Sequence, residues 1–194
     1  MNNKKTNDLL QAAADGVALR QKLCEGLIDD IIDTASFMAK ILKKGGTLFL
    51  AGNGGSASDC EHFATELIVR LTGKFERKSL PAVSLTANGS LMTAAGNDYG
   101  FDKIFSRQVE SLAGKNDLLI LISTSGNSKN LVEAAKVARK NKVPMVCLLG
   151  GKGGLLKKYS DHSIVVPSSS VQRIQEEHIF IIHNLVHLIE QELF

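Results

Sequence analysis

His62 and Glu66 stand four residues apart, directly behind a glycine-rich segment. If this stretch is helical, positions i and i+4 share a face, so an imidazole and a carboxylate lie side by side. Such a pair can bind a metal ion, act as an acid and a base, or form an ordinary contact on a helix surface. The adjacent glycine segment favours a functional interpretation over the surface contact.

That glycine segment, residues 52–56 (GNGGS), follows the apolar run at residues 47–50. The run predicts a buried strand, and helix-compatible residues resume at Ala57. A strand, a glycine turn and a helix direct backbone N–H groups and the positive end of the helix at an anion. The sequence therefore predicts a phosphate-binding turn beside the His62–Glu66 pair.

A second turn is rich in hydroxyl groups. Residues 117–122 (DLLILI) predict a strand buried on both faces, and residues 123–128 (STSGNS) follow directly. Hydroxyls and backbone N–H groups at a helix start suit phosphate oxygens, and the alternative is a helix cap with additional serines. With both turns at one sheet edge, we expect a sugar phosphate as ligand. The GNGGS turn lacks the spacing of a dinucleotide-binding fingerprint.

Gln175 and His183 lie eight residues apart near the C-terminus. On a helix such residues point about 80° apart, so both can border one stripe. A histidine in an apolar helix costs free energy unless it has a partner. From the residues alone, His183 is either a site residue or a hydrogen-bonded core residue, and His178 and His187 compete with it.

Strand-like and helix-like segments alternate along the chain after residue 45. We expect strands at residues 47–50, 82–86, 117–122, 144–149 and 163–166, and helices at residues 57–71, 90–96, 101–112 and 171–193, with a further helix from the STSGNS turn to residue 140. Residues 97–100 should break the helical pattern. The alternation predicts one α/β domain, residues 1–194, with a doubly wound, five-stranded parallel sheet flanked by helices. Ligands bind at the carboxyl ends of such strands.

Residues 1–44 predict a helical segment ahead of the α/β core at 45–194, with Gly16 and Gly26 as candidate breaks. The last helix is apolar over most of its circumference, and a helix of this kind is buried on more than one side. We therefore expect a homo-oligomer in which the N-terminal helices and the last helix form a bundle.

The composition excludes several classes of partner. The net charge is +3 and the basic residues are scattered, which argues against nucleic acid. No segment approaches the roughly 18 apolar residues of a membrane span, and the first residues carry no apolar stretch of signal-peptide length. The three cysteines, Cys24, Cys60 and Cys147, share no metal or disulfide spacing. We expect a cytoplasmic protein that binds neither nucleic acid nor a membrane.

Four segments in this order carry a resemblance to a known family: AGNGGSASDCEHFATEL, GNDYGFDKIFSRQVE, ISTSGNS and RIQEEHIFIIH. The chain resembles the phosphoheptose isomerases of the SIS (sugar isomerase) fold over nearly its whole length. The resemblance implies conversion of D-sedoheptulose 7-phosphate to D-glycero-D-manno-heptose 7-phosphate through a cis-enediol. This reaction opens ADP/GDP-heptose synthesis for lipopolysaccharide core or other surface glycans. A homotetramer with active sites at subunit interfaces, and one Zn²⁺ per subunit, are implied too.

The resemblance also implies roles for individual residues. Glu66 and His183 match the acid/base pair of the family, and the zinc ligands match His62, Glu66, Gln175 and His183. The substrate and phosphate contacts match Asn53, Gly54, Gly55, Glu66, Asn97, Asp98, Ser123, Thr124, Ser125, Ser128 and Gln175. Our hypothesis assigns proton transfer at carbon to Glu66 and proton transfer at oxygen to His183. Because a zinc-bound side chain is not free as a base, ligand and catalyst roles would alternate.

Two places depart from the family pattern. Residues 168–172 lack the acidic residue that some relatives place just ahead of Arg173, and Asn88 stands where many relatives have aspartate. Two other functions also remain open: a non-catalytic SIS-fold adaptor that binds the replication initiator, and an isomerase of a pentose or hexose phosphate. The presence of both Glu66 and His183 favours an enzyme over the adaptor.

Overall fold

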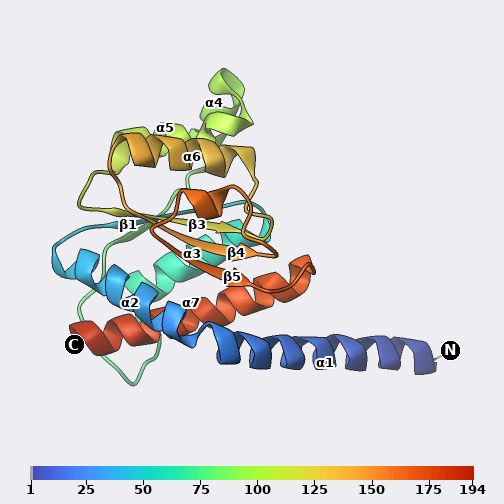
Figure 1. Cartoon of the computed structure of the whole chain (residues 1–194). Helices are drawn as coiled ribbons and strands as arrows, with labels where there is room; N and C mark the ends of the chain where they lie inside the picture. The colour runs from blue at the N-terminus through green and yellow to red at the C-terminus, as the bar shows by residue number, and fades with distance from the viewer. Residues whose placement is uncertain (1) are drawn as a thin grey trace.

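Five parallel strands form the central sheet, in the order β2–β1–β3–β4–β5. The computed structural model describes residues 2–194 (Figure 1). Its strands are β1 Leu48–Gly52, β2 Ala82–Ser84, β3 Leu118–Ser123, β4 Met145–Gly150 and β5 His162–Val166. In the register of the central strands, Leu50 is opposite Ile120, which is opposite Val146. The expected doubly wound sheet of five parallel strands is thereby confirmed.

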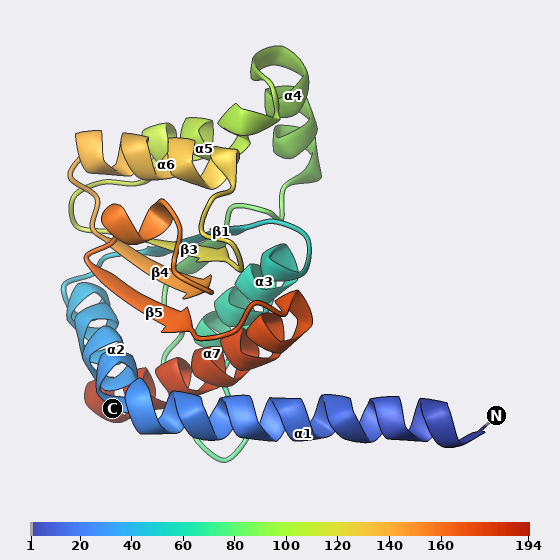
Figure 2. The same cartoon turned by 45° about the vertical axis from the view of Figure 1, so that its right-hand side comes forward.

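Helices cover both faces of this sheet. They are α1 Asn2–Gly26, α2 Ile28–Lys43, α3 Gly55–Ile68, α4 Gly89–Tyr99, α5 Ile104–Leu112, α6 Lys129–Lys140 and α7 Val171–Leu193, with two short 3-10 helices at Phe101–Lys103 and Leu156–Lys158. Helices α5 and α6 lie on one face, with α4 beyond them, and α2, α3 and α7 lie on the other (Figures 1 and 2). Helix α1 projects past the carboxyl ends of the strands.

The side chains of each strand alternate between two cores. Leu50 and Ile120 pack in the core under α2, α3 and α7, whereas Ala51 and Leu121 pack in the core under α5 and α6. Successive side chains of a strand point to opposite faces of the sheet. Because both faces are covered, every residue of β1, β3 and β4 is buried, as uninterrupted apolar runs predict.

Several expected helix bounds were wrong. Helix α3 begins at Gly55 and ends at Ile68, rather than spanning 57–71. Helix α4 continues through residues 97–99, which we expected to break it, and ends at Gly100. A 3-10 turn then precedes α5, so residues 101–112 are not one helix. Gly100 has a φ of 84°, a conformation that glycine adopts without steric cost, and it decides where α4 stops.

The chain ends also differ in detail from expectation. Gly16 lies inside α1 without breaking it, and the helix ends at Gly26. Ser170 is the N-cap residue of α7, but its side chain makes no capping hydrogen bond. Helix α7 is less uniformly apolar than expected, because it buries Glu177, His178 and Glu190. Each of the two carboxylates forms an ion pair with an arginine, which offsets the cost of its burial.

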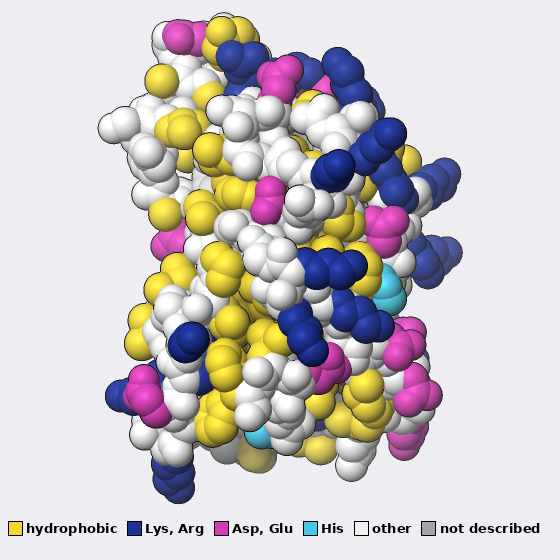
Figure 3. All heavy atoms as spheres, turned by 90° about the vertical axis from the view of Figure 1, so that its left-hand side faces the viewer, with side chains coloured by type: hydrophobic (Ala, Val, Ile, Leu, Met, Phe, Trp, Pro, Cys, Tyr) yellow, Lys and Arg dark blue, Asp and Glu magenta, His cyan; other side chains and the backbone are white. Residues whose placement is uncertain are grey.

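One face of the molecule carries charged side chains of both signs. In Figure 3 most Lys and Arg side chains lie in the upper and right-hand part of the view, with Asp and Glu side chains among them. None of the helices in the described part of the chain combines the length and the apolar character that a bilayer crossing requires.

Candidate active site

The two turns expected to bind an anion follow neighbouring strands. Strands β1 and β3 pair directly, and the GNGGS and STSGNS turns leave their carboxyl ends. The helix after β1, α3, covers one face of the sheet, and the helix after β3, α6, covers the other (Figures 1 and 2). A strand order that diverges in this way opens a crevice at the carboxyl edge, where ligands bind.

A reciprocal amide pair ties the two turns together. Asn53 in the first turn donates to Asn130 Oδ1 at 3.0 Å, and Asn130 donates back to Asn53 Oδ1 at 2.8 Å. Asn130 Oδ1 also accepts from the backbone N–H of Leu131 at 2.9 Å. Sequence reasoning missed Asn130, because a single asparagine in the first turn of a helix looks like an ordinary helix start.

The serine turn gathers hydroxyl groups at the start of α6. Ser123 Oγ accepts from the backbone N–H of Gly126 at 3.1 Å, while Ser128, the N-cap residue of α6, makes no side-chain capping bond. Ser128 is thus the N-cap of α6 by position only, and its Oγ lies 3.4 Å from Ser123 Oγ. The choice between a phosphate site and a helix cap with additional serines stays a prediction. A cavity of about 280 Å³ opens beside the turn, and its lining includes Thr124, Ser125, Lys152, Ser168 and Ser169.

Ser168 and Ser169 belong to the segment in which we expected a departure from the family pattern, and both line this cavity. The polar part of the lining consists of serine and threonine hydroxyls, the Asn127 side chain and one lysine. Hydroxyls and a cation suit phosphate oxygens.

Two distant helices bring their functional side chains together. His62 on α3 and His183 on α7 approach within 2.9 Å between their Nε2 atoms, and His62 Nε2 lies 3.5 Å from Glu66 Oε1. The ligand atoms of all three residues lie within 4.8 Å of one another. The geometry confirms that His62, Glu66 and His183 form one cluster, between α7 and the helix that follows the GNGGS turn.

The cluster fits a catalytic metal ion by its donor set. Two imidazoles and one carboxylate are a common set of three protein ligands for zinc, with the fourth position left to water or substrate. Bonds of about 2.0–2.2 Å in tetrahedral geometry separate ligand atoms by about 3.3–3.6 Å. The separation of 3.5 Å between His62 and Glu66 lies in this range, and the separation of 2.9 Å between His62 and His183 is shorter. The His62 side chain is 41% exposed, which leaves the cluster accessible to a small molecule.

Comparisons with known proteins show the family of this chain. Residues 13–150 match the SIS domain family. The phosphoheptose isomerase of Leptospira biflexa is 42% identical over 180 residues, which cover 93% of this chain and 92% of the relative. A phosphoheptose isomerase of Campylobacter jejuni is 50% identical over 169 residues, covering 86% and 89%.

This chain belongs to the phosphoheptose isomerase family of SIS-domain proteins.

Solved structures of the family share the fold. The phosphoheptose isomerase of Neisseria gonorrhoeae matches with a TM-score of 0.89 and 36% identity, over 96% of this chain and 98% of that one. The enzyme of Francisella tularensis matches with a TM-score of 0.90 and 32% identity, over 98% and 99%. The resemblance to phosphoheptose isomerases carried by the four sequence segments is confirmed.

Gln175 contacts the glycine turn. A Cβ placed on Gly55 would lie 2.3 Å from Gln175 Nε2, so this side chain rests on the backbone where α3 begins. His62 follows seven residues later, about 10 Å along the helix axis. Gln175 thus borders the glycine turn. Its role as a fourth metal ligand stays a prediction.

Asn97 and Asp98 lie elsewhere in the chain. Both are in the last turn of α4, where Asn97 donates to Asp98 Oδ1 at 2.8 Å. Helix α4 is on the opposite side of the sheet from α3 and α7 in both views (Figures 1 and 2). A single chain therefore does not bring these two residues to the His62–His183 cluster. Asn88 accepts from the backbone N–H of Leu91 at 3.0 Å and caps α4, a role that aspartate fills equally well.

The two competing histidines of α7 have other surroundings. His178 is fully buried, and its Nε2 lies 3.2 Å from the carbonyl oxygen of Leu149. Burial lowers the pKa of His178 to about 4, partly opposed by that carbonyl. His187 lies 3.2 Å from Gln191 on the exposed side of the helix. The structure thus singles out His183 among the three.

A buried carboxylate near the cluster was not foreseen. Asp59 is one turn before His62 on α3 and only 6% exposed, and its Oδ2 has no hydrogen-bond partner among the described residues. Burial raises the pKa of Asp59 to about 6, partly opposed by His62. Its spacing of three residues from His62 was the available signal.

Proposed function

We propose that this chain interconverts D-sedoheptulose 7-phosphate and D-glycero-D-manno-heptose 7-phosphate. The reaction is the first step of ADP/GDP-heptose synthesis for lipopolysaccharide core or other surface glycans. The observation that carries the proposal is the approach of His62 and His183 to 2.9 Å, with Glu66 beside them. The glycine and serine turns, which follow the paired strands β1 and β3, support it. The phosphoheptose isomerases that match nearly the whole chain support the choice of substrate.

The isomerisation needs a proton to move between two carbons and another between two oxygens. Glu66 removes the proton from C1 of the open-chain ketose and returns it at C2, which passes through the cis-enediol. His183 moves the other proton between O1 and O2. A positioned acid or base of this kind contributes about 10²–10⁴-fold to the rate.

His62, Glu66 and His183 are the residues that would hold Zn²⁺, with Gln175 proposed as a further ligand. When bound there, the ion supplies polarisation of the substrate carbonyl. The STSGNS turn, through Ser123, Thr124, Ser125 and Ser128, is proposed to bind the phosphate. Asn53, Gly54 and Gly55 are proposed to contact the sugar at the other turn.

We place the site at a subunit interface of a homotetramer as part of the same proposal. Helix α1 exposes Leu9, Leu10 and Val17 by 60–73%, which favours burial against another copy. A neighbouring subunit would then supply Asn97 and Asp98. Sedimentation at micromolar concentration tests this, and a monomer would contradict it. The three free cysteines support a reducing compartment, the cytoplasm.

The decisive experiment is incubation with sedoheptulose 7-phosphate and detection of an aldoheptose phosphate by NMR. Ribose 5-phosphate and fructose 6-phosphate serve as parallel substrates. A faster reaction with either of them would replace the heptose by a smaller sugar. No product from any substrate, with tight binding to a protein partner, would support the adaptor instead.

A further inference from the structure

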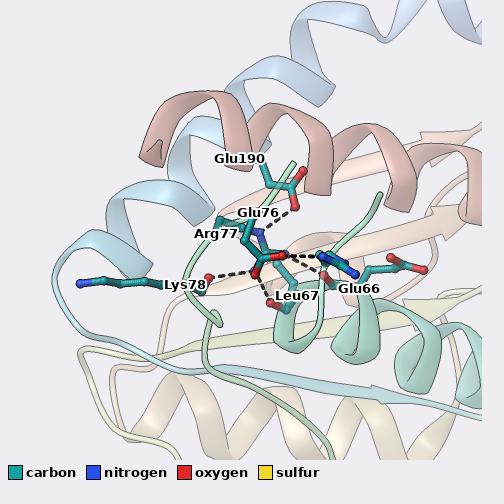
Figure 4. Close-up of polar contacts among 7 residues, drawn as sticks. Glu66, Leu67, Glu76, Arg77, Lys78 and Glu190 are labelled. Atoms are coloured by element: carbon teal, nitrogen blue, oxygen red, sulfur yellow. Dashed lines mark hydrogen bonds and ion pairs between the residues drawn. The ribbon is translucent and has the colours of Figure 1, made fainter. Parts of the chain in front are cut away.

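Arg77 binds the end of the helix that carries Glu66. Its Nη2 donates to the carbonyl oxygen of Glu66 at 2.8 Å, and its Nη1 donates to the carbonyl oxygen of Leu67 at 2.8 Å (Figure 4). The last carbonyls of a helix have no partner within the helix. Arg77 therefore caps the C-terminal end of α3, although it lies in a loop nine positions beyond that end.

The same guanidinium holds the neighbouring helix. Arg77 Nε donates to Glu190 Oε1 on α7 at 2.7 Å, and the side chains of the two residues are 0% and 5% exposed. A further bond to the carbonyl oxygen of Lys78 at 3.0 Å fixes the loop itself. One planar group with donors in a fixed arrangement thus joins α3, α7 and the loop (Figure 4).

Three contacts between α3 and α7 occur in the same order along both helices. Gln175 lies against Gly55, then His183 against His62, and finally Glu190 is joined through Arg77 to the carbonyl of Glu66. The two helices are therefore parallel. The Arg77–Glu190 pair lies closer to their C-terminal ends than the contact between His62 and His183 does. A sliding of α3 past α7 would change the distance from Glu66 to His183.

Glu66 belongs both to the cluster with His62 and His183 and to the contacts of Arg77. Its side chain belongs to the cluster with His62 and His183, while its backbone carbonyl is bound by Arg77. Because Arg77 is anchored to α7 through Glu190, it fixes the Glu66 backbone relative to the helix that carries His183. Arg77 forms none of the cluster contacts itself.

We propose that Arg77 is a positioning residue that sets the distance of the Glu66 carboxylate from His183, and so controls both metal binding and proton transfer. The proposal rests on the proposed function. In this proposal Arg77 changes metal binding and proton transfer by holding the backbone carbonyls of Glu66 and Leu67 in place. Its positive charge does not act on the cluster directly.

The test compares Arg77→Lys, the double variant Arg77→Met/Glu190→Leu and the control Val109→Ala. Lysine keeps the positive charge, but a single ammonium cannot reach Glu190 and both α3 carbonyls together. The double variant removes both buried charges and replaces them with apolar groups, a change that often preserves stability. Val109 is buried in the core on the other face of the sheet. Its replacement by alanine should destabilise the fold without changing a contact of α3 or α7.

Melting temperature, zinc affinity by chelator competition, kcat and KM are measured for each protein. In Arg77→Lys we expect zinc affinity to fall about 10- to 100-fold, the range typical for outer partners of a metal site. We expect kcat to fall at least about tenfold and KM to stay within about twofold, since the Arg77 side chain is 0% exposed and is not among the proposed substrate contacts. The double variant should recover the melting temperature but neither zinc affinity nor kcat. Val109→Ala should lose only melting temperature.

Zinc affinity and kcat within twofold of wild type in folded Arg77→Lys would overturn the proposal, as would their recovery in the double variant. Glu190→Gln replaces Arg77→Lys if that variant does not fold, with the same expectation. A wild-type protein without isomerase activity would refute the proposed function, while the zinc affinities would still decide the role of Arg77.

Discussion

His62 and His183 are 121 residues apart in sequence and belong to different helices, yet their Nε2 atoms lie 2.9 Å apart. Helices α3 and α7 are parallel on one face of the sheet, and Glu66 completes the cluster one turn beyond His62. Most of the chemistry proposed for this chain depends on that single approach.

Replacing Glu66 with glutamine removes the proposed base but keeps the size of the side chain. We expect kcat for sedoheptulose 7-phosphate to fall about 10²–10⁴-fold, with an unchanged fold by circular dichroism. Glu110→Gln, an exposed carboxylate on α5 paired with Arg107, is the control and should keep its activity. Turnover near wild type in Glu66→Gln would remove this residue from the mechanism.

Replacing His62 with alanine should abolish stoichiometric zinc binding, because two protein ligands remain from the cluster of three. Metal content is measured by mass spectrometry after dialysis against a zinc buffer. His187→Ala changes an exposed histidine on α7 and should retain about one zinc per subunit. Equal zinc content in the two variants would show that the ion, if bound, lies elsewhere.

Replacing Gly55 with alanine should displace Gln175. The new Cβ would lie 2.3 Å from Gln175 Nε2 and 3.0 Å from its Cδ, so the amide must move. Loss of one substrate hydrogen bond is worth roughly 1 kcal/mol, which corresponds to a rise in KM of about fivefold. Gly73→Ala, where a Cβ meets nothing within 4 Å, is the matched control. An unchanged KM in Gly55→Ala would argue against a substrate contact by Gln175.

The buried His178 should make folding stability sensitive to acid. Its folded pKa of about 4 is below the ordinary 6.5, so between these values the unfolded chain binds a proton that the folded chain does not. Stability therefore falls as the pH drops from 6.5 towards 4, by about 2 kcal/mol at pH 5. Asp59 has the opposite shift, to about 6, and opposes the loss over this range.

The measurement that isolates His178 is the difference between wild type and His178→Gln, which keeps a donor for the Leu149 carbonyl but does not titrate. Urea unfolding of both proteins at pH 7 and pH 5, without metal, gives the two free-energy changes. The variant should lose less free energy of unfolding between the two pH values. Equal losses in both proteins would show that His178 does not carry the acid sensitivity.

Local sequence patterns determined much of the fold and part of the site. Apolar runs located the strands, and the glycine and serine turns after β1 and β3 lie at one sheet edge as expected. The spacing of His62 and Glu66 placed them on one helical face, because helical geometry depends only on neighbouring residues. Helix ends near residues 57 and 97 were predicted less well, since backbone conformation at Gly54 and Gly100 decides them.

Tertiary structure alone decided which histidine of α7 meets α3. His178, His183 and His187 all belong to the same helix, but only His183 reaches His62, because the rotation and axial position of α7 depend on long-range packing. The Arg77–Glu190 pair that ties α7 to α3 joins residues 113 positions apart, beyond the reach of any local pattern. The position of Asn97 and Asp98 was likewise decided by the tertiary structure. Both belong to α4, and the sheet lies between this helix and the helices that carry the cluster.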